Sequence, residues 1–178
     1  MLRRLRYRIG FLLALLLVSN GVMALTLTTR SLPYAAPDVS FQSQGKTHSL
    51  KEYRGHKVLL WMFSTWCHTC VAGVKALEKQ QAALEKQGLL ILSIRNHNNG
   101  GYPGPDMTNF MKKFGPYTLT SNNWVLGESS TEMYRQLNPT RFPDIYFLID
   151  ELGQIQVVDT APNLTMNKIV NFANSASK

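Results

Sequence analysis

Cysteine is scarce in this chain, and its scarcity narrows the chemistry that the sequence supports. The only two cysteines are Cys67 and Cys70. Two thiols cannot form the several bridges of a small disulfide-stabilised domain, and no second Cys/His pair stands at the spacing of a four-ligand zinc site. What remains is a C-x-x-C motif between a strand-like and a helix-like segment, which is typical of thiol–disulfide chemistry.

Charge is also limited, at 17% of the 178 residues, and it is unevenly placed. Half of the formal net charge of +8 comes from Arg3, Arg4, Arg6 and Arg8. The remaining excess of about +4 is spread along the chain without a basic stripe or interleaved aromatics, which argues against nucleic-acid binding. No internal repeat or low-complexity tract is present, and the 44% hydrophobic content fits one globular domain.

The N-terminal segment has the layout of a secretory signal peptide, which we predict over residues 1–24. The basic residues are followed by an apolar run at 11–18 and by Ala24, a small residue of the kind that precedes a cleavage site. The alternative is an uncleaved membrane anchor at 9–27, which has about the length needed to cross a bilayer, although residues 19–21 interrupt its apolar character. Both interpretations predict a periplasmic location for the rest of the chain, where an isolated cysteine pair suggests a redox couple.

The remainder is predicted to form a linker at residues 25–34 and one domain at 35–178. A polar turn at Gln44-Gly45 predicts a short N-terminal β-hairpin. Two continuous apolar runs predict strands that are covered on both faces, and the segment between them has the apolar spacing of a helix. This βαβ unit implies parallel strands, so the predicted fold class is α/β. The other expected elements are strands at 57–63 and 89–94, helices at 67–87 and 106–114, one or two strand pieces within 117–126, a helix that ends at 137, a second hairpin at 144–149 and 154–158, and a closing helix that ends at 176.

The C-x-x-C motif is expected at the start of the first long helix. There, unpaired N–H groups and the helix dipole stabilise a thiolate on Cys67. Cys70, one turn further, is expected to be more buried and close enough to attack Cys67, so we predict Cys67 as the nucleophile and Cys70 as the resolving residue. His68 either stabilises the thiolate when protonated or is a solvent-exposed histidine with little effect.

The sequence resembles the thioredoxin superfamily, and more narrowly the exported redoxin-like proteins of the TlpA/ResA/DsbE type. Two segments carry the resemblance, FSTWCHTC at residues 63–70 and RFPDIYFLIDELG at 141–153. It extends over roughly residues 35–176. It implies a thioredoxin-like fold with an N-terminal β-hairpin extension and a helical insertion after the second parallel strand.

The resemblance also implies roles for residues near the cysteines. It implies that Pro143 forms a cis peptide bond and faces the cysteine pair, whereas propensity alone favours an ordinary trans-proline at the start of a strand. Trp66 is expected to pack beside the site. Phe142 and Pro143 are expected to offer backbone groups to an extended substrate segment.

Several positions depart from the family pattern or leave alternatives open. Thr69 stands where the family often has proline. Trp61 and Gly73 stand where it often has an acid, which leaves the proton acceptor for the buried thiol unassigned. Arg95 and His97 follow the second strand, whose carboxyl end is on the side of the cysteines, but the composition around them favours an exposed loop.

The resemblance implies an extracytoplasmic thiol–disulfide oxidoreductase that works through the Cys67/Cys70 couple and needs no cofactor or metal. It implies reduction of partner-protein disulfides, as in cytochrome c maturation or thiol recycling, with a second redox partner that recycles the cysteines. One alternative is a copper-binding redoxin-like metallochaperone, although these usually space their cysteines C-x-x-x-C. Another is a peroxiredoxin-type peroxidase, for which Leu60 and Ser64 occupy positions that require Pro and Thr.

Overall fold

The structure is a computed structural model that describes residues 31–176. The predicted signal peptide at 1–24, the alternative anchor at 9–27 and most of the predicted linker lie outside the described residues. Within residues 31–176, no helix has the length and apolar character needed to cross a membrane.

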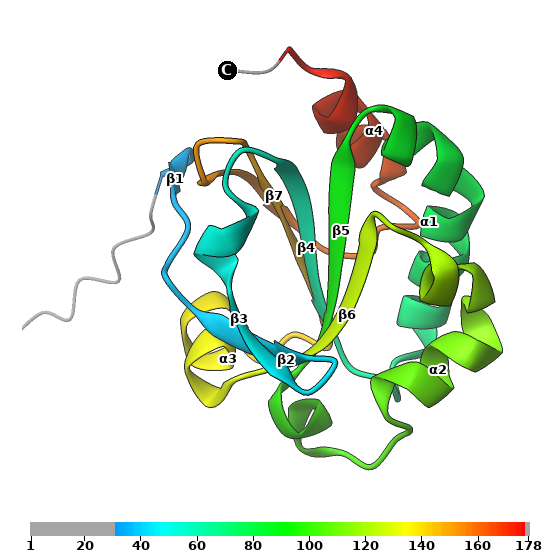
Figure 1. Cartoon of the computed structure of the whole chain (residues 1–178). Helices are drawn as coiled ribbons and strands as arrows, with labels where there is room; N and C mark the ends of the chain where they lie inside the picture. Colours follow the sequence, from blue (N-terminus) through cyan, green and yellow to red (C-terminus); the bar gives the residue numbers. More distant parts are fainter. Residues whose placement is uncertain (1–30, 177–178) are drawn as a thin grey trace, which may run out of the picture.

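A single mixed sheet of eight strands forms the centre of the described domain, in the order β1-β8-β7-β4-β5-β6-β2-β3 (Figure 1). The neighbours β4, β5 and β6 run parallel, and the other neighbouring pairs are antiparallel. This arrangement confirms the predicted α/β class and both predicted hairpins. The strands are β1 (Tyr34–Ala35), β2 (Ser40–Ser43), β3 (Lys46–Ser49), β4 (Lys57–Phe63), β5 (Leu89–Arg95), β6 (Trp124–Ser129), β7 (Asp144–Ile149) and β8 (Gln154–Asp159).

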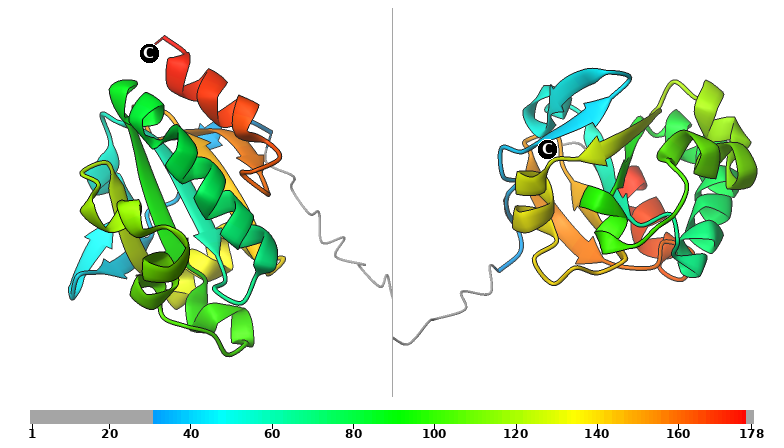
Figure 2. Two further views of the ribbon diagram at one scale, coloured as in Figure 1. Left: turned by 90° about the vertical axis from the view of Figure 1, so that its right-hand side faces the viewer. Right: turned by 90° about the horizontal axis from the view of Figure 1, so that it is seen from below.

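Helices cover both faces of the sheet (Figures 1 and 2). On one face, α1, α2 and α4 pack together, and α1 and α4 lie side by side in both figures. On the other face lie α3 and η1. The helices are α1 (His68–Lys86), α2 (Met107–Phe114), α3 (Thr131–Leu137) and α4 (Met166–Asn174), with the 3₁₀ helices η1 (Leu50–Tyr53), η2 (His97–Gly101) and η3 (Pro116–Thr120).

The segment between β5 and β6 is the predicted helical insertion, but one part of it differs from the prediction. The Asp106 side chain caps α2 by accepting a hydrogen bond from Asn109 N. The first strand piece expected within 117–126 is instead the 3₁₀ helix η3, because Pro116 presets a helical turn at its start. The second piece becomes β6, the third parallel strand. At the other edge of the sheet, Tyr34 pairs with Ile155 and so belongs to the sheet.

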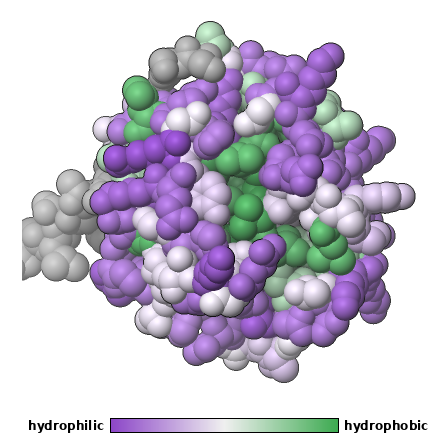
Figure 3. Space-filling model, in the orientation of Figure 1, coloured by the Kyte–Doolittle hydropathy of each residue, from purple (hydrophilic) through white to green (hydrophobic). Residues whose placement is uncertain are grey.

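The sheet divides the buried side chains into two cores. All seven residues of β4 are buried, as its continuous apolar run predicts for a central strand. Leu59, Trp61 and Phe63 pack under α1 and α4, whereas Leu60 and Met62 face α3 and η1. On the face drawn in Figure 3, hydrophilic side chains surround a hydrophobic band at the centre, where Figure 1 shows the sheet between its two layers.

A close contact between β4 and α1 sets the position of the helix that carries the cysteines. The Trp61 ring is fully buried and stacks on Phe63 with ring centroids 4.2 Å apart. Gly73 faces this ring, and a Cβ atom at Gly73 would lie 2.8 Å from its Cζ2 and Cη2 atoms. The absence of a side chain at Gly73 therefore lets α1 settle directly on Trp61.

We expect Gly73→Ala to lower the free energy of unfolding by about 1–2 kcal/mol, measured by urea denaturation. Overpacking a filled core costs about 1–3 kcal/mol, and the better helix propensity of Ala offsets up to about 1 kcal/mol. The double variant Trp61→Phe/Gly73→Ala has a smaller ring under the helix, so it should lose less than the sum of the single variants. Strictly additive losses would contradict this account of the contact.

Candidate active site

The C-x-x-C motif lies where β4 passes into α1. The strand ends at Phe63, a three-residue turn follows, and Cys67 is the N-cap of the helix. The turn is closed by a 3.0 Å hydrogen bond from Cys67 N to Ser64 O. Cys67 and Cys70 are joined by a disulfide, with Cα atoms 5.3 Å apart. Both sulfur atoms therefore lie at the helix end where N–H groups and the dipole favour negative charge.

The two cysteines differ in burial in the predicted order. Cys67 is 5% exposed and Cys70 is 0% exposed, and both belong to the core beneath α1. Partner sulfur atoms can approach Cys67 more readily than Cys70. The assignment of nucleophile and resolving residue stays a prediction, and this order of burial agrees with it.

The two residues inside the motif lie differently. The Thr69 hydroxyl oxygen is 3.0 Å from Cys67 Sγ, close enough to donate a hydrogen bond to that sulfur. His68 is exposed, and its side chain makes no hydrogen bond or ion pair with any described residue. The geometry thus gives Thr69 a direct contact with the sulfur, which the sequence alone did not indicate.

Pro143 forms the opposite wall of the site through its backbone. Its carbonyl oxygen accepts a 2.9 Å hydrogen bond from Ser64 N and lies 3.7 Å from Cys70 Sγ. The expected cis bond before Pro143 is wrong for this structure, because the only cis peptide among residues 31–176 is Leu32–Pro33. The Phe142–Pro143 bond keeps the trans form that X-Pro bonds intrinsically prefer.

Buried asparagines join the cysteine turn to the loop before Pro143. The Asn96 side-chain amide donates to Ser64 Oγ at 3.0 Å and to Phe142 O at 3.2 Å. The Asn138 side chain accepts from Phe142 N at 2.8 Å and donates to Phe142 O at 2.7 Å. The two side chains also meet, with Asn138 Nδ2 3.3 Å from Asn96 Oδ1. Their exposures of 0% and 1% make this a solvent-shielded network.

A third asparagine, Asn99, holds the same turn from the insertion. Its side-chain oxygen accepts from Thr65 N at 2.8 Å, and its backbone oxygen accepts from Trp66 Nε1 at 2.7 Å. Asn98 and Asn99 have φ angles of 48° and 54°, a left-handed conformation that asparagine tolerates better than most residues. None of these asparagines was among the predicted site residues. For Asn96, the position directly after the buried parallel strand β5 was the available signal, whereas Asn138 follows α3 and carried no such signal.

Exposed aromatic side chains surround the cysteine pair. Trp66 is 37% exposed, and its ring meets the 62% exposed Tyr102 edge-on with centroids 5.0 Å apart. Phe142, which precedes Pro143, is 47% exposed. Trp66 and Phe142 are the chain neighbours of Cys67 and Pro143, and both rings lie at the surface rather than in the core. The backbone groups of Phe142, which were expected to face a substrate, instead bond the Asn138 side chain. Tyr102 was not predicted.

A buried carboxylate, Asp144, lies on the α1 side of the sheet directly after Pro143. It accepts hydrogen bonds from Trp61 Nε1 at 2.6 Å and from Ala161 N at 3.2 Å. Burial raises the pKa of the Asp144 carboxyl above its ordinary value, and the hydrogen bonds from Trp61 and Ala161 oppose that shift. The family pattern places an acid where this chain has Trp61 or Gly73. In the structure the acid that contacts Trp61 is Asp144, the first residue of β7.

The basic residues at the end of β5 and just after it make no hydrogen bond or ion pair with the cysteines. Arg95 pairs with Glu128 at 2.6 Å and donates to Pro105 O at 3.1 Å. His97 is half-buried, and its Nε2 lies 3.3 Å from Thr131 Oγ1. His97 therefore lies against α3, while Asn98 and residues 101–106 of its loop are exposed, as the composition predicts.

Two other observations bear on ligands. In the part of the chain that the structure describes, no group of three or more His, Cys, Asp or Glu side chains is placed to hold a metal ion.

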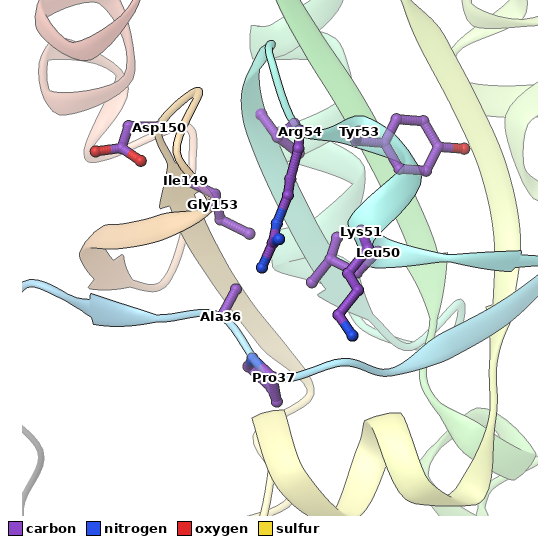
Figure 4. Close-up of a pocket in the computed structure, with 10 residues that line it drawn as sticks. Ala36, Pro37, Leu50, Lys51, Tyr53, Arg54, Ile149, Asp150 and Gly153 are labelled. Carbon is purple, nitrogen blue, oxygen red and sulfur yellow. The ribbon is translucent and has the colours of Figure 1, made fainter. Parts of the chain in front are cut away.

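The cavity in Figure 4 lies between η1, the chain before β2 and the turn after β7, and measures about 20 Å³. That volume holds about one water molecule, and Val58 in its lining marks the end of β4 away from the cysteines.

Comparison with known proteins gives consistent matches. Residues 34–174 match the model of the Redoxin family. The thiol-disulfide oxidoreductase ResA of Geobacillus thermodenitrificans is 30% identical over 137 residues, which cover 75% of this chain and 70% of that protein. ResA of Geobacillus kaustophilus is 29% identical over 174 residues, covering 93% and 91%. The thioredoxin domain of a thiol-disulfide oxidoreductase from Bacteroides vulgatus has a similar fold, with a TM-score of 0.63 at 17% identity, over 79% of this chain and 96% of that one.

The Thr69 contact generates a prediction for the reduced protein. We expect Thr69→Val to slow iodoacetamide labelling of Cys67 at mildly acidic pH by about fivefold, because a hydrogen bond worth about 1 kcal/mol no longer stabilises the thiolate. Thr69→Ser keeps the hydroxyl and should label at the wild-type rate. Equal labelling rates for Thr69→Val and Thr69→Ser would show that the hydroxyl does not stabilise the thiolate.

The burial of Asp144 generates a prediction about pH. Because the pKa of its carboxyl is raised in the folded state, its contribution to stability is complete below the ordinary value of 3.8 and is lost as the pH rises through the folded-state pKa. The stability difference between Asp144→Asn and wild type should therefore shift in favour of the variant from pH 3.5 to about pH 7, measured by urea denaturation.

Asp106→Asn is the matched control. Asp106 is an exposed N-cap whose pKa is lowered chiefly by the hydrogen bond from Asn109 N, so its stabilisation is lost on acidification. Asp106→Asn should therefore lose stability relative to wild type as the pH rises from 3.5 to about 7. The same sign of change in both variants would contradict the assignment for Asp144.

Proposed function

The chain belongs to the redoxin family and is a thiol–disulfide oxidoreductase, and from this premise we propose that it works outside the cytoplasm and reduces disulfides of partner proteins through Cys67 and Cys70. The observation that carries the proposal is the Cys67–Cys70 disulfide at the start of α1, facing the carbonyl of Pro143. Thiolate stabilisation and unequal burial of the two sulfur atoms are the features that such an exchange needs.

The proposed exchange begins with reduced protein. The Cys67 thiolate attacks one sulfur of the partner disulfide, which forms a Cys67–partner bond and releases the other partner sulfur as a thiolate. Cys70 then loses its proton and attacks Cys67 Sγ, which releases the second partner sulfur. Two electrons pass to the partner, and the Cys67–Cys70 disulfide seen here is the product. A second dithiol partner must reduce that disulfide before the next cycle.

The exposed surface beside the cysteines supports a protein substrate. Trp66, which precedes Cys67, and Phe142, which precedes Pro143, both present exposed apolar rings. The Phe142 backbone is already engaged, because its N–H and its carbonyl bond the Asn138 side chain, so the exposed Phe142 ring rather than strand-like pairing offers the contact to a substrate segment.

The proposed location rests on residues outside the described region. The pattern at 1–24, or at 9–27 if it is an anchor, favours export by either route. A periplasmic setting also fits a chain whose two cysteines form one redox pair. No observation in the structure favours the copper-binding or peroxidase alternatives.

The reaction is tested by trapping partners with Cys70→Ser. This variant keeps the Cys67 thiolate but lacks the sulfur that releases the substrate, so mixed disulfides should accumulate on Cys67. They are measured by non-reducing electrophoresis and mass spectrometry of periplasmic fractions, with release by dithiothreitol.

Two controls sharpen this experiment. Cys67→Ser should trap nothing, because the proposed attacking sulfur is absent. Trapping by Cys67→Ser but not by Cys70→Ser would reverse the two roles, and partners found only in cytoplasmic fractions would contradict the proposed location.

A further inference from the structure

A hollow of about 420 Å³ adjoins the turn that carries Cys67, between η2 and the segment that runs from α3 to β7. Figures 1 and 2 show η2 and α3 beside each other at one end of the sheet. Gly100 links the hollow to the turn, because a Cβ atom there would lie 2.9 Å from Ser64 Oγ and 3.9 Å from Trp66 Nε1. Gly100 therefore packs against the cysteine turn and also lines the hollow, and Arg141, in the same lining, stands two residues before Pro143, so the hollow is within a few residues' reach of a segment bound at the cysteines.

The hollow is rich in hydrogen-bond donors and poor in negative charge. No Asp or Glu is among the residues that line it. Arg141 extends from its wall, and its guanidinium forms no ion pair with any described residue. The Tyr134 hydroxyl likewise makes no hydrogen bond within residues 31–176. Arg135 differs, since Glu132 already binds its guanidinium at 2.6 Å. The unmatched groups thus suit an anionic acceptor.

The walls of the hollow are fixed before any ligand arrives. Asn138 lies in its lining and connects to Asn96 and Phe142 through the buried network described above. Arg141 has a φ of 56°, and its N–H donates to Asn138 O at 3.0 Å, which anchors the residue that carries the guanidinium. A pre-formed site avoids part of the ordering cost of binding.

We propose that this hollow binds an acidic side chain of the partner protein, carried on the extended segment that contains the partner's reactive disulfide. Arg141 supplies the charge and Tyr134 a hydrogen bond to the carboxylate. This inference rests on the proposed function and adds to it a substrate preference, namely disulfides flanked by Asp or Glu.

The probes are two synthetic peptides that each contain an internal disulfide and differ only in flanking it with two Glu or two Lys residues. Pre-reduced protein is mixed with each peptide at low ionic strength, and the second-order rate constant of peptide reduction is measured. Wild-type protein should reduce the Glu peptide about twofold to fivefold faster, the size expected for a charge pair with an exposed arginine. Added salt should diminish the difference.

Three variants assign the preference to the hollow. Arg141→Glu should abolish or invert it, and Tyr134→Phe should slow only the Glu peptide. Lys86→Glu makes the same change in net charge at the other end of α1, about 28 Å along the helix from Cys67, and should retain the wild-type preference. Near-ultraviolet circular dichroism and the measured potential of the Cys67–Cys70 couple verify that each variant keeps its fold and redox site.

The outcomes separate this inference from the proposed function. Equal rates for both peptides, or a preference that Lys86→Glu reduces as much as Arg141→Glu does, would overturn the acidic-segment site while leaving the reductase proposal intact. Failure of the wild-type protein to reduce either peptide or any trapped partner would overturn the proposed function itself.

Discussion

The pairing of β4 with β7 is the constraint on which the site depends. Its antiparallel register brings Phe63 opposite Asp144, and the hydrogen bond from Ser64 N to Pro143 O extends the contact beyond the end of β4. The same Pro143 carbonyl reaches Cys70 Sγ. Because β4 is buried on both faces, a one-residue shift in this register would exchange its side chains between the two cores and remove Trp61 from its place beneath Gly73, so the packing of the sheet determines the position of the proline relative to the disulfide.

Buried polar side chains then fix the positions of the loops around the cysteines, which the sheet sets only approximately. Asn96, Asn99 and Asn138 have exposures of 4% or less, and their amides hydrogen-bond the cysteine turn, the loop before Pro143 and each other. A buried amide without a hydrogen-bond partner costs free energy. The hydrogen bonds of these asparagines therefore favour the observed arrangement of the cysteine turn, the start of the insertion and the loop before Pro143. Thr69 makes a separate contact with the sulfur of Cys67. Rigid support of this kind lets the reactive sulfur lie at the surface of a packed core.

The chemistry and the proposed recognition occupy neighbouring parts of one edge. The disulfide lies at the N-terminus of α1, where the helix favours a thiolate. Exposed rings of Trp66 and Phe142 border it, and the donor-rich hollow with Arg141 continues from the same turn. In the proposed recognition, a partner segment would contact apolar, reactive and cationic groups along this one edge. The insertion after β5 contributes η2 to the wall of the hollow, so under this proposal that loop takes part in the choice of substrate.

Local sequence determined the elements and the reactive motif, because periodicity and capping act over a few residues. The strand predicted at 57–63 is β4 as observed, Asp106 caps α2, and Cys70 is more buried than Cys67. Contacts between distant segments were decided by the tertiary structure alone. Trp61 and Asp144 are 83 residues apart and meet only because β4 and β7 pair. The joining of the segment at η2 to the α3–β7 loop through Asn96 and Asn138 also depends on the whole fold, since no local pattern encodes which side chains the sheet brings together.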